Sequence, residues 1–460
     1  MEIYQYSIGQ LKKLINQRKV SPEELYEIFL KRIKKYNPKL NAFLTVIDKP
    51  KIDYKKRGLP LFGIPFSMKD VYVTKGVRTT ASSKVLENYI PQYDATVYKK
   101  LKNAGAILIG KTNCDAWGHG SSTENSDFGP TRNPWNLKYV PGGSSGGSAA
   151  GLAANLSVFD IGEDTGGSIR LPAAFCSIVG LKVTYGLVSR YGAIAYASSL
   201  DTVGPMTRTV KDCAIVLEAI AGIKKPVTYW TSVKVPKYSQ LLNKNVGALK
   251  IGIPKEYFTE GIDKEVAKQI EQAIKIFKKM GMKMVEISLP MTKYAVATYY
   301  LIATSETSSN LARYDGIRYG KARNKFGPEA KRRIILGTFT LSAGYYDAYY
   351  LKATKVRTLI KNDFNEAFKK VDVILAPTSP TPPFKIGEKI DDPLKMYLSD
   401  ILTIPVNLAG LPALSIPCGL SKDKLPIGMQ LIGKHFDEAK ILNIGYKFEK
   451  QIGGFPIIKN

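Results

Sequence analysis

The hydrophobic residues of this chain alternate between strand-like and helix-like patterns. Short apolar runs at residues 249–253 and 284–287 predict strands. Between them, apolar residues recur at helical spacing, at Val266, Ile270, Ala273, Ile274, Phe277 and Met280. With further predicted strands at residues 372–375 and 414–416, this strand-helix-strand unit predicts an α/β fold in which helices sandwich a mixed β-sheet.

A helix start signal lies near the N-terminus. Residues 21–24 (SPEE) combine a capping serine, a proline at the first helical position and a glutamate three residues after the serine. We expect this helix to reach Tyr36 and to end before Asn37 and Pro38, because a proline disfavours helical geometry in the residue before it.

Two glycine-serine runs carry the candidate chemistry. Residues 142–147 read GGSSGG, residues 164–170 read DTGGSIR, and Lys69 lies upstream in residues 63–70 (GIPFSMKD). A serine hydroxyl attacks an amide only when a neighbouring base takes its proton. Histidine is the usual base, but this chain has only two histidines and neither lies beside a paired serine and carboxylate. We therefore expect Lys69 to be the base.

A lysine base must be neutral, which near pH 7 means that its pKa falls from about 10.4 by roughly three pH units. Burial lowers the pKa of a lysine because it disfavours the charged form. Lys69 follows the apolar stretch 59–66 (LPLFGIPF), so we expect its amine to be buried and thereby neutral. Taken alone, Lys69 would be interpreted as a surface lysine at a strand end.

The second glycine-serine run predicts a nucleophile and an oxyanion hole. Thr165, Gly166 and Gly167 are small, so backbone N–H groups can turn inward around a developing oxyanion. Ser168 follows them directly and is the candidate nucleophile.

Ser144 is the candidate bridge between the nucleophile and the base. It lies 24 residues before Ser168, and the residues between them predict a short helix (148–154) and a strand (156–161). An excursion of this kind can return the chain to the same edge of a sheet. We therefore expect Ser144 to relay a proton between Ser168 and Lys69.

Other interpretations of these motifs remain weaker. One glycine-serine run alone is more often a flexible loop or a phosphate nest. Residues 142–146 also match the G-x-S-x-G elbow, but that motif needs a later histidine, where only His435 is present, and Pro141 disfavours a preceding buried strand. Residues 105–112 have the spacing of a phosphate loop, but the interior residues 106–109 predict a strand.

At these residues the chain resembles the amidase signature family, and within it the glutamine-hydrolysing A subunits of tRNA-dependent amidotransferases. The resemblance extends from about residue 5 to residue 450. It includes residues 120–126 (GSSTENS), 198–201 (SSLD), 204–205 (GP), 344–350 (GYYDAYY) and 405–412 (PVNLAGLP). It implies that Lys69 is the base, Ser144 the bridging serine and Ser168 the nucleophile. It also implies an oxyanion hole lined by Thr165, Gly166 and Gly167.

The resemblance also implies a substrate pocket. A site that selects free glutamine needs a cation for the α-carboxylate and an anion for the α-ammonium. Arg333 is implied for the carboxylate, Asp400 for the ammonium, and Tyr299 for the pocket lining; without the resemblance, the first two would be interpreted as surface charges. Residues 115–119 (DAWGH) replace a Glu-Phe-Ala-Met type of run in the family, so we expect Trp117 to reshape the neighbouring wall.

Composition bounds the organisation and the environment of the chain. Its 460 residues permit one large domain or two to three ordinary ones; because the motifs are spread from Lys69 to Asp400, we expect a single domain, 1–460, with a possible surface bridging segment at 224–247. The four cysteines lack metal-ligand spacing and no apolar run marks a secretory signal. We therefore expect free thiols, no metal, no membrane span and a cytoplasmic location.

The net charge of +28 does not identify a binding partner. Lysines that neutralise RNA phosphates, an acidic partner subunit and a merely lysine-rich composition are all compatible with it. The resemblance implies a glutaminase that needs no cofactor of its own. Its ammonia would pass to a kinase-like B subunit that uses ATP and Mg²⁺ to amidate Glu-tRNA(Gln) or Asp-tRNA(Asn), with a small C subunit in the complex. The alternatives are a stand-alone amidase for other small amides and an RNA-binding scaffold with an inactive site.

Overall fold

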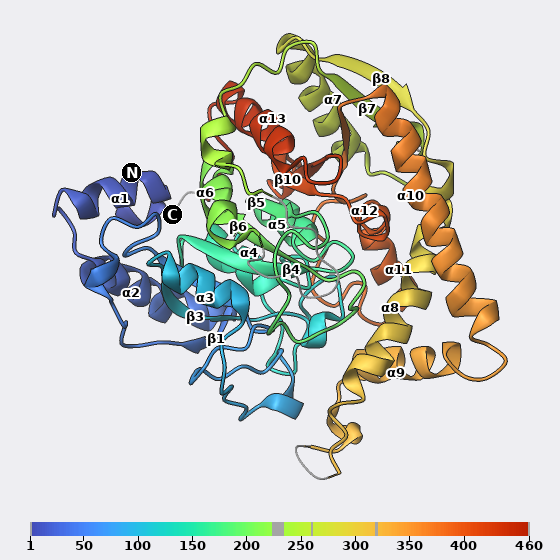
Figure 1. Ribbon diagram of the computed structural model, residues 1–460, viewed down its shortest axis with the longest axis horizontal. Coiled ribbons are helices and arrows are strands. Elements are labelled where there is room, and N and C mark those ends of the chain that lie inside the picture. Colours follow the sequence, from blue (N-terminus) through green and yellow to red (C-terminus); the bar gives the residue numbers. More distant parts are fainter. Residues whose placement is uncertain (1, 223–233, 259–260, 318–320, 459–460) are drawn as a thin grey trace.

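One eleven-stranded sheet forms the centre of the protein (Figure 1). The computed structural model describes residues 2–222, 234–258, 261–317 and 321–458. In spatial order the strands are β1 (Phe43–Val46), β3 (Ile107–Thr112), β2 (Pro65–Lys69), β4 (Phe159–Asp164), β6 (Thr202–Thr207), β5 (Val179–Lys182), β10 (Ala413–Leu420), β11 (Pro426–Ile432), β9 (Val373–Pro377), β7 (Lys250–Pro254) and β8 (Lys283–Ile287). Strand β2 is parallel to β3 and β4, and β7 is parallel to β8 and β9, whereas the other neighbours are antiparallel. The predicted mixed sheet is confirmed.

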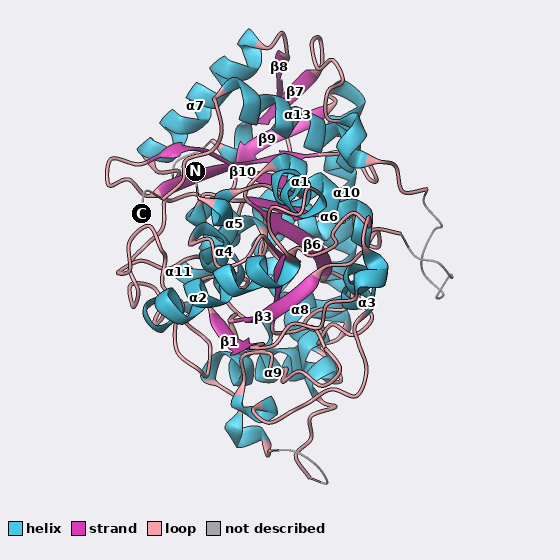
Figure 2. Ribbon diagram, turned by 90° about the vertical axis from the view of Figure 1, so that its left-hand side faces the viewer, coloured by secondary structure: helices cyan, strands magenta, loops and turns pink. Residues whose placement is uncertain are grey.

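Helices cover both faces of this sheet. They are α1 (Ile8–Asn16), α2 (Pro22–Leu40), α3 (Thr96–Asn103), α4 (Gly146–Ala153), α5 (Arg170–Cys176), α6 (Val210–Ile220), α7 (Lys264–Lys279), α8 (Ala295–Leu311), α9 (Pro328–Thr340), α10 (Lys352–Lys370), α11 (Pro393–Tyr397), α12 (Ile404–Ala409) and α13 (Glu438–Gln451). Figure 1 shows α1 and α2 on one side of the molecule and α8, α9 and α10 on the other, and Figure 2 views the molecule from the side of α1 and α2.

Strand β9 lies between the two largest hydrophobic clusters, and its side chains alternate between them. Val373 and Leu375 belong to the core that includes α6, α7 and α13. Ile374 and Ala376 belong to the core formed with α8, α10 and α12. Because successive strand residues point to opposite faces, the central strands are buried from both sides.

The predicted strand-helix-strand unit is confirmed as β7, α7 and β8. Strands β9 and β10 also lie where apolar runs predicted them. The helix expected at 148–154 is α4, and the strand expected at 156–161 begins later, as β4.

The predicted end of the first long helix is wrong. Helix α2 continues through Asn37 and Pro38 and ends at Leu40. Pro38 lies in the last turn, where its missing N–H removes only one helical hydrogen bond. Beyond it, the Asn37 side-chain oxygen accepts the N–H groups of Ala42 and Phe43, both at 2.8 Å, and these bonds close the helix end.

The segment expected to bridge two lobes lies partly outside the described residues, because 223–233 are not among them. In its described part, Tyr238 and Leu242 are buried in the core. Within the described chain, none of the helices combines the length and the apolar character that crossing a membrane requires. The four cysteines are free thiols.

Candidate active site

Lys69 ends strand β2 and is fully buried. Its Nζ donates to Ser144 Oγ at 2.7 Å and to the carbonyl oxygen of Glu163 at 3.3 Å. The same nitrogen forms an ion pair of 2.9 Å with Glu163 Oε2. Because β2 and β4 are parallel neighbours, their carboxyl ends meet at one edge of the sheet, which is why Lys69 and Glu163 come together.

The ion pair reverses the expected charge of Lys69. Burial is the largest single effect and lowers the pKa of Lys69, as predicted, but the charge and hydrogen bond of Glu163 together with Cys114 and Asp115 outweigh it, so the pKa of Lys69 is raised. The prediction that burial makes this lysine neutral is therefore wrong in direction. In this arrangement Lys69 is an ammonium whose three hydrogens all have acceptors.

Ser144 and Ser168 lie on adjoining backbone segments. The N–H of Ser145 donates to the carbonyl oxygen of Ser168 at 3.1 Å. The Ser145 hydroxyl donates to the carbonyl oxygen of Glu163 at 3.2 Å, which joins the same segment to the end of β4. The assignment of Ser168 as nucleophile and Ser144 as bridge remains a prediction.

The glycines before Ser168 occupy positions where a side chain would not fit. Gly167 has φ of +147°, and a Cβ there would lie 2.3 Å from Thr403 Oγ1. A Cβ on Gly166 would lie 2.7 Å from the hydroxyl of Tyr299. Among the hydrogen bonds of the described residues, none uses the N–H of Gly166 or of Gly167 as a donor. These two amides are free to bind an oxyanion, and the oxyanion hole itself stays a prediction.

A buried ionic network supports this loop from behind, and the sequence analysis missed it. Arg170 Nε lies 3.1 Å from Asp164 Oδ2, and both side chains are fully buried. Asn407 donates to Asp164 Oδ1 at 2.9 Å, and Arg170 Nη1 donates to Gln430 Oε1 at 2.9 Å. Burial is the largest single effect and opposes ionisation of Asp164, but Arg170, Lys182 and Asn407 together outweigh it, and the pKa of Asp164 is lowered to about 2. Asp164 and Arg170 flank the glycine-serine run, but Asn407 and Gln430 lie more than two hundred residues further along the chain and only spatial contact brings them to this pair.

Of the three implied substrate residues, Tyr299 and Asp400 lie against the glycine loop, and Arg333 is joined to Tyr299 through the hydroxyl of Tyr196. Arg333 is buried; its Nε donates to Glu329 Oε1 at 2.8 Å and its Nη1 donates to the hydroxyl of Tyr196. Tyr299 donates to the same hydroxyl at 3.4 Å. The interpretation of Arg333 as a surface charge is thereby excluded.

Asp400 is also buried, against Gly167. One of its oxygens, Oδ2, accepts the hydroxyl of Ser121, whereas Oδ1 has no partner among the described residues. A Cβ on Gly167 would lie 3.0 Å from that free oxygen. Burial raises the pKa of Asp400 to about 8. A buried acceptor without a donor fits a ligand that brings one, such as an ammonium group.

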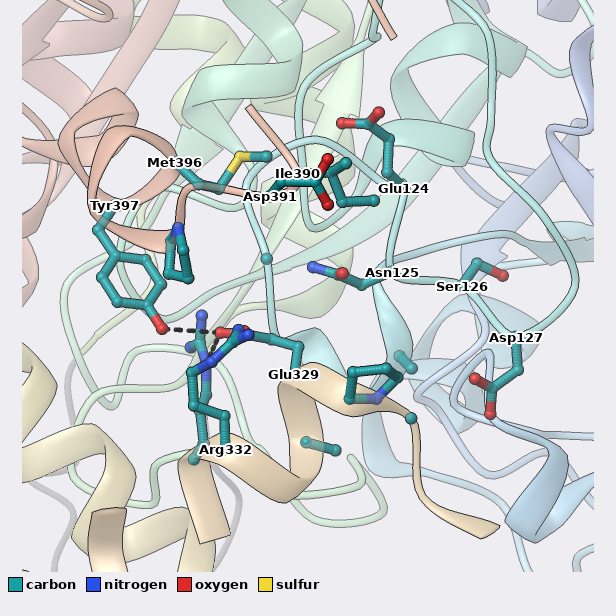
Figure 3. A pocket seen from close by; sticks show the side chains of 17 residues that line it. Glu124, Asn125, Ser126, Asp127, Glu329, Arg332, Ile390, Asp391, Met396 and Tyr397 are labelled. Carbon is teal, nitrogen blue, oxygen red and sulfur yellow. Dashed lines mark hydrogen bonds and ion pairs between the residues drawn. The ribbon is translucent and has the colours of Figure 1, made fainter. Parts of the chain in front are cut away.

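A cavity of about 450 Å³ is lined by Arg333, whereas Tyr299 and Asp400 are not part of its wall. Figure 3 shows Glu329, Arg332 and Tyr397 on one side of it and Glu124 and Asn125 across from them. The Tyr397 hydroxyl donates to Glu329 Oε1 at 3.0 Å, which is the carboxylate oxygen that also binds Arg333. This wall therefore holds the guanidinium of Arg333 in a fixed position.

Trp117 does not line this cavity, and its effect on the substrate wall stays a prediction. Its ring packs into the core against Phe326, at 5.2 Å between centroids, and against Tyr314, at 4.9 Å. His119 contacts the pocket indirectly: its ring lies edge-on to that of Tyr196 at 4.7 Å. Burial lowers the pKa of His119 well below its usual value, so its imidazole is neutral.

The described residues contain no group of three or more His, Cys, Asp or Glu side chains that could hold a metal ion. A buried lysine that is hydrogen-bonded to one serine, beside a glycine-rich loop that carries a second, is the arrangement expected of an amide-cleaving serine hydrolase. An Amidase family model matches residues 24–442, and the chain belongs to this family.

Its relatives are glutamyl-tRNA(Gln) amidotransferase A subunits. The chain is 53% identical to that of Caldanaerobacter subterraneus subsp. tengcongensis, over 98% of this chain and 97% of the relative. It is 54% identical to that of Geotalea daltonii, over 98% of both chains. The crystal structure of the A subunit from Thermotoga maritima superposes with a TM-score of 0.87 at 45% identity, covering 98% of this chain and 95% of the other.

Proposed function

We propose that this chain is the glutaminase subunit of a tRNA-dependent amidotransferase. The observation that carries the proposal is its similarity, over nearly the whole chain, to glutamyl-tRNA(Gln) amidotransferase A subunits. Three features of the site support it: the hydrogen bond of buried Lys69 to Ser144, the buried guanidinium of Arg333, and the buried Asp400 oxygen that has no partner among the described residues.

In the proposed reaction, Ser168 Oγ attacks the side-chain amide carbon of glutamine. Ser144 takes the proton of Ser168 and passes its own to Lys69, which acts as the base once its ammonium group has lost a proton. The N–H groups of residues 165–167 stabilise the oxyanion. The proton then returns to the leaving nitrogen, ammonia departs, and water hydrolyses the glutamyl ester of Ser168 to glutamate.

Substrate selection rests on the two ends of the pocket. Arg333 binds the α-carboxylate of glutamine and Asp400 binds its α-ammonium, while Tyr299 fills the side of the pocket next to Gly166. A simple amide that lacks these charged groups leaves Arg333 and Asp400 without partners, which lowers its reactivity relative to glutamine.

The ammonia is consumed elsewhere in a complex. We propose a kinase-like B subunit, which activates Glu-tRNA(Gln) or Asp-tRNA(Asn) with ATP and Mg²⁺, and a small C subunit. The basic surface implied by the charge of +28 lies beside tRNA or an acidic subunit in that complex. Because charged tRNA is made there, we propose a cytoplasmic location.

Glutamate release by the complex purified from native extract tests this function. With charged tRNA and ATP present, the proposal expects glutamine hydrolysis that disappears in Ser168→Ala. Faster turnover of aliphatic or aryl amides than of glutamine would favour a stand-alone amidase instead. RNA binding without any amide turnover by the wild-type chain would favour a scaffold.

A further inference from the structure

A line of buried side chains runs from Lys69 to Asp201. Glu163 binds Lys69 through Oε2, at 2.9 Å, and its other oxygen, Oε1, contacts Thr165 Oγ1. Thr165 Oγ1 also lies 2.8 Å from Asp201 Oδ1. Two backbone N–H groups, at 2.9 Å and 3.1 Å, hold the Asp201 carboxyl in place. The threonine hydroxyl thus lies between two carboxyl groups.

The two contacts of the Thr165 hydroxyl fix how many protons Glu163, Thr165 and Asp201 share. The hydroxyl of Thr165 has one hydrogen, which it can donate to only one of its two carboxyl neighbours. The second contact is a hydrogen bond only if the other carboxyl is protonated and donates to the hydroxyl oxygen. The three groups therefore hold one proton beyond the hydroxyl hydrogen, on Glu163 or on Asp201.

The position of that proton decides what Lys69 contacts. With the proton on Asp201, Glu163 is a carboxylate and holds Lys69 as an ammonium, which cannot accept a proton from Ser144. With the proton on Glu163, the negative charge is on Asp201 and Lys69 contacts an uncharged acid. Burial then favours the neutral amine that catalysis needs.

We propose that Glu163, Thr165 and Asp201 form a proton relay that sets the charge of Lys69. Asp201 Oδ1 gives its proton to Thr165 Oγ1, whose own hydrogen passes to Glu163 Oε1. The negative charge thereby moves from Glu163 to Asp201 with no change in total charge. Lys69 then gives a proton to Ser144, whose own hydrogen passes to Ser168 and from there to water in the substrate site, and the neutral amine can accept a proton back by the same route.

In this proposal Glu163 and Asp201 are positioning residues, because they act through Lys69, and the proposal rests on the role of Lys69 in the proposed function. Burial, and after it the neighbouring Glu163, raise the pKa of Asp201 to about 8, which keeps a proton on it near neutral pH. The other titratable and charged groups that face Lys69 and the relay are Tyr72, Cys114, Asp115, Asp160 and Arg190.

Changes at the two ends of the relay test it, because they act in opposite directions. Glu163→Gln removes the charge beside Lys69, so the acid limb of the pH profile of serine reactivity moves to lower pH by about one pH unit or more. Asp201→Asn removes the proton donor and leaves Glu163 a carboxylate, so the same limb moves to higher pH by a similar amount. A merely structural role lowers the rates without moving the limb in opposite directions.

The readout is inactivation of the full-length protein by phenylmethanesulfonyl fluoride, measured between about pH 5 and pH 10. Ser168 Oγ bonds to sulfur, fluoride leaves, and the serine proton passes through Ser144 to Lys69. Because this reaction needs no glutamine, failure of the proposed glutaminase function is distinguished from failure of the relay.

Glu366→Gln is the matched control, since Glu366 forms an exposed ion pair of 2.6 Å with Lys369. It is expected to keep the wild-type profile. The proposal is overturned if the acid limb lies at the same pH in the wild type and in both relay variants. It is also overturned if Glu163→Gln and Asp201→Asn move the limb in the same direction. If Asp201→Asn does not fold, an acid limb that stays in place or moves upward in Glu163→Gln overturns it alone.

Discussion

The hydroxyl of Thr403 donates a hydrogen bond of 2.6 Å to the carbonyl oxygen of Gly166. That oxygen belongs to the peptide unit whose N–H is the amide of Gly167. In a planar trans peptide the C=O and the N–H point in opposite directions, so the bond to Thr403 turns the Gly167 amide away from Thr403. Thr403 thus orients one of the two amides available for the oxyanion hole.

Replacing Thr403 by valine removes this donor with little change in volume. We expect kcat for glutamine hydrolysis to fall roughly 10- to 100-fold, because a misplaced oxyanion donor acts on the transition state. The Michaelis constant should change little. Thr358→Val, at an exposed position of α10, is the control and should leave kcat unaltered. A kcat for Thr403→Val equal to that of the control would contradict the assignment of this loop.

The raised pKa of Asp400 leads us to expect that glutamine binding depends on pH. Burial raises its pKa to about 8, so the unliganded carboxyl is protonated below that pH, whereas the α-ammonium of glutamine pairs with the ionised form. Affinity should therefore rise as the pH increases toward 8. Binding of glutamine to the Ser168→Ala variant, measured by calorimetry, checks this without interference from the reaction, and it should release protons near neutral pH.

In Asp400→Asn this pH dependence should disappear, and affinity should fall roughly tenfold or more, the equivalent of about 1.4 kcal/mol. Asp423→Asn, at an exposed position, is the matched control and should bind like the parent. Affinity that is the same in both variants would show that Asp400 does not bind the ammonium.

The Arg170–Asp164 pair predicts a large loss of stability when it is broken. Arg170→Leu leaves the carboxylate of Asp164 buried without its cation, which should lower the free energy of unfolding by about 3–5 kcal/mol. Urea denaturation measures this, and Arg313→Leu, in an exposed hydrogen bond, should have little effect. Since the folded pKa of Asp164 is lowered to about 2, the contribution of the pair is present above the unfolded value near 3.9 and is lost as the pH falls through about 2.

Much of the fold was predictable because it depends on local patterns. The apolar runs of β7 and β8 and the helical spacing of α7 correspond to elements that pack as their periodicity requires. The order of the strands was not predictable, since neighbours such as β5 and β10 are more than two hundred residues apart. The end of α2 was missed because the side chain of Asn37 closes the helix after Pro38.

The site was predictable only as far as its motifs extend. Lys69, Ser144 and the glycine loop stand out as residue types in an unusual pattern, and Lys69 and Ser144 are in contact. The charge of Lys69 was mispredicted because it depends on Glu163, which reads in sequence as an ordinary residue at a strand end. Only the pairing of β2 with β4 brings the two together.

Mass spectrometry of the complex, quenched in acid during glutamine turnover, tests the central claim most directly. If Ser168 attacks glutamine with the help of Ser144 and Lys69, a glutamyl ester should appear on the peptide that contains Ser168 and be absent in Ser168→Ala. A glutamyl ester on Ser144, or glutamine hydrolysis that persists in Ser168→Ala, would contradict the claim.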